Sequence, residues 1–129
     1  MQNVLLAFSN KITSKQVAEI IGVLFQEVQN HSSEPDRYVL IKDDDAIFLR
    51  TCSSLKENYE EWFEQDQYDL VMSLESFIEM QYRNLNTARV SLKILCREFE
   101  SMTIIFDDSY FTSAEFLARL EIDSAWDWR

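Results

Sequence analysis

The chain has 129 residues, of which 47% are hydrophobic, and its 23 acidic against 12 basic residues give a formal net charge of −11. This length predicts one domain over residues 1–129, large enough to bury a core without disulfides or metals. So large an acidic excess argues against direct binding to nucleic acid or to an anionic membrane surface, because phosphate groups are held by Lys and Arg.

Targeting signals and covalent cross-links are not indicated. The N-terminal MQNVLLAFSNK lacks the basic region of a signal peptide, and no stretch approaches the roughly 18 apolar residues of a membrane span. Cys52 and Cys96 are far apart and match no metal-binding spacing, so reduced, buried thiols are favoured over a disulfide. We therefore expect a cytoplasmic protein.

The first part of the chain predicts a strand and a long helix. Residues 4–8 are apolar and predict a short strand or a strand-like lead-in. Thr13 followed by Gln16 is a capping box, and apolar residues recur behind it at helical spacing, which predicts a helix over 14–30. The single glycine, Gly22, lies inside this pattern and is not expected to form a phosphate-binding loop.

A β-hairpin is predicted next, near residues 38–50. Residues 38–42 and 46–50 are rich in β-branched and aromatic side chains and flank Asp43-Asp44-Asp45. No glycine supplies the positive φ that such a connection needs, but Asp tolerates that conformation better than most residues.

Two helical segments are predicted after the hairpin, either as one bent helix or as a pair of helices. Ser54 with Glu57 is a second capping box, which predicts a helix reaching about Gln65. Apolar residues from Leu70 onward share one helical face and predict a helix over 69–83.

The last part of the chain adds helices and a short strand. Residues 88–100 fit a helix or an alternating strand, and their length favours the helix. Residues 102–106 predict a strand, and Thr112 with Glu115 caps a last helix. The sum is an α+β fold, a helix-rich single domain with a small antiparallel sheet that includes the hairpin.

The strongest functional signal is an acidic stretch between Leu55 and Met80, where eight carboxylates face one lysine, Lys56, for a net charge of −7. Aromatic residues are interleaved with these acids, and a negative field with aromatic anchors suits the capture of a basic protein. The alternative is a solvated helix face. The predicted partner-binding residues are Glu57, Tyr59, Glu60, Glu61 and Glu64.

Two shorter acidic clusters are secondary candidates for partner contact. Neither forms a convincing cation site, because consecutive side chains in a turn cannot converge and no second motif completes the pair after the strand. Solvated turns are the favoured alternative. The clusters are Asp43, Asp44 and Asp45, and Asp107 and Asp108.

Catalytic signals are weak by comparison. His31 is the single histidine, so any triad has to use it, and one His with two distant Cys residues makes a poor zinc ligand set. Paired carboxylates of glycosidase type are available on any acidic helix. We expect no enzyme activity, no cofactor and no metal.

A basic cluster and an aromatic tail follow the acidic stretch. The cluster is expected to pair internally with the acidic stretch, with a second binding patch as the alternative. Trp126 and Trp128 are expected to dock on the domain rather than to form an exposed hook. The cluster consists of Arg83, Arg89, Lys93 and Arg97.

In size, acidity and lack of catalytic motifs, the chain resembles the small immunity proteins of bacterial contact-dependent growth inhibition and colicin systems. The resemblance implies a cytoplasmic protein, monomeric or weakly dimeric, that binds and neutralises one cognate basic toxin domain such as a nuclease. Electrostatic steering would speed such association, and buried aromatic residues would slow dissociation.

Two other functions stay open. A nucleic-acid mimic of anti-restriction or anti-CRISPR type should array its acids in rows, whereas this sequence bunches them in one stretch. An acidic secretion chaperone should dimerise and offer hydrophobic grooves to an unfolded segment.

Overall fold

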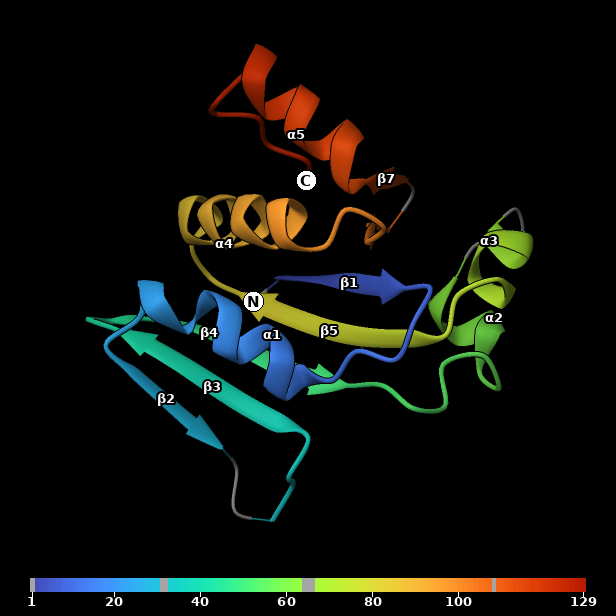
Figure 1. The fold of residues 1–129 in the computed structure, drawn as a ribbon, viewed down its shortest axis with the longest axis horizontal. Helices are drawn as coiled ribbons and strands as arrows, with labels where there is room; N and C mark the ends of the chain where they lie inside the picture. Colours follow the sequence, from blue (N-terminus) through green and yellow to red (C-terminus); the bar gives the residue numbers. More distant parts are fainter. Residues whose placement is uncertain (1, 31–32, 64–66, 108) are drawn as a thin grey trace.

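The computed structural model describes residues 2–30, 33–63, 67–107 and 109–129. They form one antiparallel sheet with the strand order β2-β3-β4-β5-β1-β6-β7, packed against helices (Figure 1). The strands are β1 (Gln2–Phe8), β2 (Glu27–Asn30), β3 (Arg37–Lys42), β4 (Asp45–Thr51), β5 (Ser76–Tyr82), β6 (Thr103–Ile105) and β7 (Tyr110–Thr112). The helices are α1 (Ser14–Ile21), the 3-10 turn η1 (Gly22–Leu24), α2 (Tyr59–Trp62), α3 (Tyr68–Met72), α4 (Leu85–Glu98) and α5 (Ser113–Ile122).

This architecture corrects the expected fold class. We predicted a helix-rich domain with a small sheet, but a seven-stranded antiparallel sheet organises the described chain, which makes it a sheet-dominated α+β fold. The error comes from two segments, in residues 14–30 and 69–83, where apolar spacing suggested a helix and the chain forms a strand.

The predicted helix over 14–30 is correct only in its first half. The capping box at Thr13 is present and α1 begins at Ser14, but the helix ends at Ile21 and β2 follows at Glu27. Val28 fits the helical spacing, yet it lies opposite Leu40 in the β2–β3 ladder and is 45% exposed. All four residues of this edge strand are exposed. Its sequence therefore lacks the alternation of apolar and polar residues that identifies a strand.

The predicted helix over 69–83 is wrong for most of its length. Only α3 is helical there, and β5 occupies Ser76–Tyr82 between β4 and β1. A central strand with side chains buried on both faces reads as a continuous apolar run instead of an alternating one. β5 has four consecutive buried residues, all apolar except Glu79: Phe77, Ile78, Glu79 and Met80.

The predicted helix from Ser54 is also shorter than expected. Residues 53–58 form turns, and α2 begins at Tyr59 after Asn58, without a side-chain cap. The end of that predicted helix, residues 64–65, lies outside the described residues.

The other predicted elements are confirmed. β1, the β3–β4 hairpin, α4 and β6 lie where the sequence placed them, and α5 begins with the capping box of Thr112 and Glu115. Asp43 adopts a φ of 55° in the hairpin turn, the conformation that Asp was expected to tolerate.

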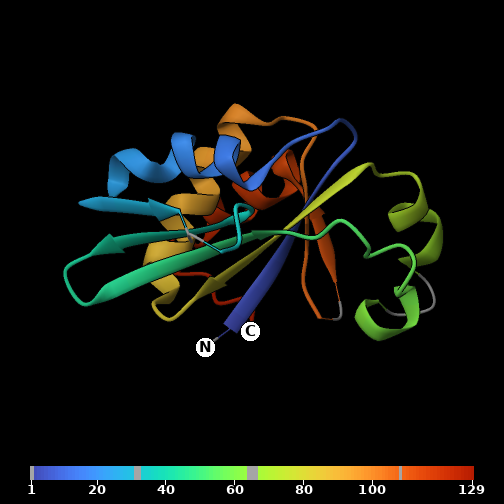
Figure 2. The same cartoon turned by 90° about the horizontal axis from the view of Figure 1, so that it is seen from below.

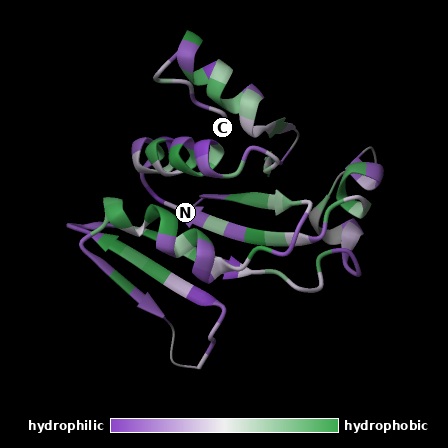
Figure 3. Ribbon diagram, viewed as in Figure 1, coloured by the Kyte–Doolittle hydropathy of each residue, from purple (hydrophilic) through white to green (hydrophobic). Residues whose placement is uncertain are grey.

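One face of the sheet carries the main core. α1, α4 and α5 lie on this face, and Leu6, Ile78, Leu92 and Phe116 are among its fully buried side chains. Figure 3 shows β1 hydrophobic along most of its length, whereas β2 at the edge is hydrophilic. The C-terminal tail docks on this core as expected, because Trp126 and Trp128 pack against Phe116 with ring centroids 5.4 and 5.7 Å away.

The opposite face is covered over only part of its area. Residues 53–75, which we call the acidic projection, connect β4 to β5 and include α2 and α3. In Figure 2 the projection lies beyond the end of the strands, on the right in green, while α1 lies above the sheet. No described helix is long and apolar enough to cross a membrane.

Candidate protein-binding surface

The acidic projection is fixed to the sheet by its own small core. Leu55, Val71 and Leu74 of the projection are 0–7% exposed and belong to one apolar cluster with side chains of the sheet. The sheet residues of that cluster are Leu5, Ala7, Phe77 and Ile105. The projection is therefore anchored on the face opposite α1, next to the start of β5.

Aromatic stacking also holds the projection. Tyr59 is 8% exposed, and its ring stacks on Phe63 at 5.4 Å and meets Tyr68 edge-on at 5.3 Å. Tyr59, predicted as a binding contact, thus has a clear packing role. Tyr68 is 50% exposed and, among the described side chains of the projection, is the aromatic ring most open to solvent. Burial depends on partners distant in sequence, so no local pattern distinguished these two tyrosines.

Four carboxylates of the projection, all among the described side chains, face solvent without basic partners. Glu57 and Glu60 are exposed, as are Asp69 and Glu75, which the sequence analysis did not single out. The ion pairs among the described residues all lie elsewhere, at Glu34, Glu79 and Asp127. Lys56 is turned inward, where its Nζ donates to the carbonyl of Met72 at 3.1 Å. The side chains of Glu61 and Glu64 lie outside the described residues.

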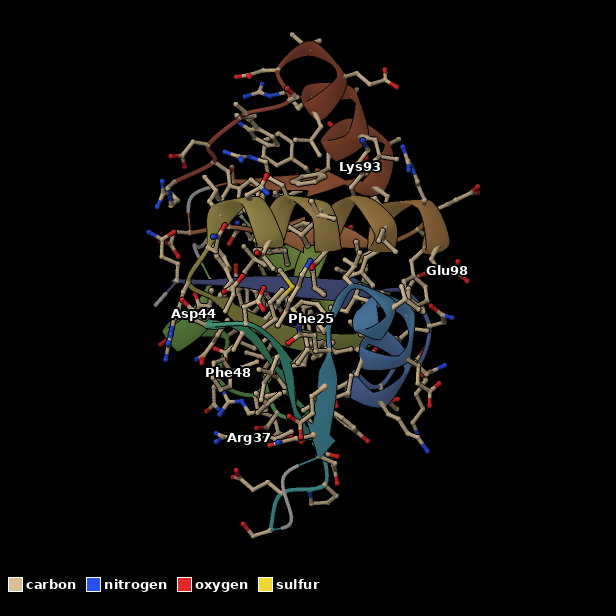
Figure 4. The ribbon with its side chains drawn as sticks, turned by 90° about the vertical axis from the view of Figure 1, so that its left-hand side faces the viewer. Phe25, Arg37, Asp44, Phe48, Lys93 and Glu98 are labelled. Atoms are coloured by element: carbon tan, nitrogen blue, oxygen red, sulfur yellow. The ribbon has the colours of Figure 1, made fainter. Side chains whose placement is uncertain are left out.

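The acidic turn of the hairpin lies at the opposite end of β4. Asp43 and Asp44 are exposed, and Asp45 is half-buried and accepts hydrogen bonds from the Ala46 amide and the Thr87 hydroxyl. Because the turn precedes β4 and the projection follows it, the fold does not bring the two acidic groups together. Figure 4 shows Asp44 near the edge of the molecule.

The third acidic candidate stands apart from both. Asp107 is exposed in the connection between β6 and β7, and Asp108 lies outside the described residues. The described residues hold no group of three His, Cys, Asp or Glu side chains that could bind a metal ion. The acidic candidates therefore do not form a metal-binding group in the described part of the chain.

The basic cluster does not pair with the acidic stretch in the described part of the chain. Arg89 instead donates from Nε to the carbonyl of Trp126 at 2.8 Å and from Nη2 to that of Ala125 at 2.9 Å. The internal pairing that we expected is wrong for this residue, which fastens the C-terminal tail to α4. Arg83 borders an open depression of 520 Å³ beside the acidic turn, which Lys42 and Asn84 also line.

The two cysteines are free thiols in different parts of the fold. Cys96 on α4 is buried in the main core, and burial raises its thiol pKa to about 11. Cys52 is half-buried after β4, and burial is the largest cause of its raised pKa. Both thiols are therefore protonated at neutral pH, which disfavours a nucleophilic role.

A polar group on the uncovered sheet face was not found from the sequence. Glu79 of β5 is 7% exposed and accepts from Arg50 Nη2 at 3.2 Å, from Asn3 at 3.3 Å and from Gln81 at 3.4 Å. These residues come from three neighbouring strands, so their meeting follows from strand order, which the sequence did not reveal.

Comparisons with protein-family models, with curated proteins and with solved structures found no match for this chain.

Proposed function

We propose that this chain is an immunity protein that binds and neutralises a basic toxin domain through the acidic projection. The proposal keeps the cytoplasmic site of action and the nuclease-type target that the sequence analysis favoured. The observation that carries it is the solvent-facing, unpaired state of Glu57, Glu60, Asp69 and Glu75 on an anchored segment.

The projection contains a single basic residue, Lys56. Lys56 keeps its positive charge, but it is half-buried against a backbone carbonyl, and the four exposed carboxylates around it leave the surface field net negative. Such a field attracts a positively charged active site and raises the association rate, most strongly at low salt. A nuclease needs such a positive site to hold phosphate, which makes it a suitable target.

The apolar part of the contact is supplied by the exposed ring of Tyr68. Tyrosine gives a large contact area at low entropic cost and is enriched among residues that dominate binding energy. Because Tyr68 is backed by the ring of Tyr59, its position is held before a partner arrives.

A capture experiment followed by a toxicity assay tests this function. The protein is used as bait in its native lysate at low and at high salt, and the captured proteins are identified by mass spectrometry. We expect one dominant basic partner, which arrests growth when expressed alone in bacteria and becomes harmless when this chain is co-expressed. A captured protein that is not toxic, a restriction or CRISPR complex, or a set of unfolded secreted proteins contradicts the proposal.

Charge reversal locates the binding surface. Replacing Glu57 and Glu60 together (Glu57→Lys, Glu60→Lys) should slow association with the captured partner about tenfold or more and flatten its salt dependence. The matched control is Glu19→Lys with Glu121→Lys, which makes the same change in net charge at exposed positions of α1 and α5. Equal slowing by both pairs would show that net charge, and not the projection, governs binding.

A further inference from the structure

The uncovered half of the sheet face opposite α1 has its own binding chemistry. It is formed by alternate residues of β3, β4 and β5, and we call it the open sheet face: Arg37, Val39, Phe48, Arg50, Glu79 and Gln81. They line a depression of 260 Å³ together with backbone neighbours. Figure 4 shows Phe48 and Arg37 on the side of the sheet away from α1.

Two arginines lie directly opposite each other on this face. Arg37 and Arg50 are Cα partners in the β3–β4 register, an arrangement in which like charges repel across the ladder. Each has one carboxylate, but the two pairs differ. The Arg37–Glu34 contact of 3.0 Å joins side chains that are 44% and 48% exposed, so water screens it strongly.

Arg50 is only partly satisfied by its carboxylate. Its Nη2 lies 3.2 Å from Glu79 Oε1, whereas its Nε is buried and has no hydrogen-bond partner among the described residues. A guanidinium prefers to bind a carboxylate through two parallel N–H groups. The side chain is still 38% exposed, so an incoming group can reach the guanidinium.

The floor of the depression beside the two arginines is apolar. Val39 and Phe48 are opposite each other two register positions along, which is the next pair on the same face, and both are half-buried. A side chain that lies over them removes apolar surface from water while its neighbour meets the arginines. The depression therefore combines an anion-binding pair of arginines with an adjacent apolar surface.

We propose that the open sheet face binds a segment of a partner protein in which a carboxylate side chain lies beside an aromatic or aliphatic one. The carboxylate accepts hydrogen bonds from Arg37 and Arg50, and the apolar side chain covers Val39 and Phe48. Because the whole chain carries −11, the partner presents this carboxylate on a surface that is otherwise neutral or basic. The inference does not depend on the acidic projection or on a toxin as target.

Peptide titration followed by NMR tests the inference without a known partner. The probe is acetyl-Phe-Glu-Val-amide, compared with the same peptide carrying Gln or Lys in place of Glu. With the Glu peptide we expect saturable shifts of the backbone amides of Phe48 and Gln81 and of the Nε–H signal of Arg50. The Gln peptide should bind about tenfold more weakly, and the Lys peptide more weakly still, because each removes the charge that the arginines bind.

Two variants that remove the same charge distinguish binding at the open sheet face from a general effect of net charge. Arg37→Gln should weaken the Glu peptide about tenfold and leave the Gln peptide unchanged, while the surface position keeps the fold intact. Arg97→Gln, at an exposed position of α4, should leave both unchanged. The inference is overturned by equal binding of the three peptides, by no saturable shift, or by an unaltered affinity in Arg37→Gln. Concentration-dependent shifts on this face without peptide would show that a second copy covers it.

Discussion

Arg129 and Asp127, near the C-terminus, form the ion pair that shifts a carboxyl pKa most among the described residues. Arg129 donates from Nε to Asp127 Oδ1 at 2.8 Å and from Nη2 to Oδ2 at 2.7 Å. These hydrogen bonds hold the carboxyl pKa of Asp127 at about 2, below its ordinary value of 3.8. Both partners face solvent, so the contact orders the tail without a large effect on folding free energy.

This geometry predicts how Asp127 titrates. Because its folded pKa is lowered, the carboxylate favours the folded state above the ordinary value, and this contribution is lost as the pH falls through about 2. Removing the cation with Arg129→Gln should return the pKa towards 3.8. Side-chain carboxyl chemical shifts, followed by NMR between pH 1.5 and 6, measure both values. A wild-type Asp127 that titrates at its ordinary value would contradict the contact.

Capping residues show which single-residue interactions can be predicted from the sequence. Thr13 with Gln16 and Thr112 with Glu115 were predicted as caps and form them, because each interaction closes within three residues. Ser54 with Glu57 has the same pattern, yet the chain turns there. The difference is tertiary: Leu55 is 3% exposed in the cluster beneath the projection, and residues 53–58 form turns around it.

At the scale of elements, short-range periodicity identified helices that lie on the sheet and missed strands at its edge and centre. α4 and α5 are amphipathic and were predicted, whereas β2 and β5 were interpreted as helix. β5 is buried on both faces, so its apolar residues recur at every spacing, including the helical one. Strand order, and with it the meeting of Arg50 and Glu79, depends on pairings that local patterns do not encode.

The candidate site was predicted in part for the same reason. The charge of the projection is a property of composition, and the sequence revealed it directly. Which side chains of the projection face solvent depends on its small core, so Tyr59 was chosen as a contact and the exposed Tyr68 was not.

The core of the projection predicts a local stability effect. Leu74 lies between α3 and β5 rather than on a helix face, but it is 7% exposed and contributes to the small cluster. Leu74→Ala should lower the free energy of unfolding by about 2–5 kcal/mol, measured by urea denaturation. Hydrogen exchange should show the loss of protection first in residues 67–75.

The matched control is a change of similar chemistry at a solvent-facing position. Val90→Ala on α4, where the side chain is 40% exposed, should change stability by no more than about 0.5 kcal/mol. An equally small effect of Leu74→Ala would mean that the cluster does not anchor the projection.

At the scale of the whole molecule, the sheet separates two different environments. α1, α4, α5 and the C-terminal tail close one face, and the projection closes part of the other. The open sheet face and the acidic projection are where this fold leaves polar and apolar groups available to a partner. Both proposed binding surfaces therefore lie away from the main core, and variants there can be made without disturbing it.

The C-terminal tail contacts residues from both ends of the chain, so its contribution to stability reports on how the whole domain packs. Trp128 Nε1 donates to Tyr82 Oη at 2.8 Å, and that hydroxyl donates to Gln2 Oε1 at 3.1 Å. The indole ring also packs against Phe106, with 5.7 Å between centroids. Trp128→Ala should therefore lower the free energy of unfolding by about 2–4 kcal/mol, somewhat less than for a fully buried ring.

A conservative variant separates packing from hydrogen bonding at this position. Trp128→Phe keeps an aromatic ring and loses the N–H donor, so it should cost about 1 kcal/mol. Burial already raises the pKa of Tyr82, and the indole N–H opposes that rise by stabilising the phenolate. Trp128→Phe should therefore raise the Tyr82 pKa further, which ultraviolet titration of the phenol detects. If the pKa stays unchanged while Trp128→Ala is strongly destabilising, the tail is held by ring packing alone, and the link through Tyr82 to Gln2 contributes nothing.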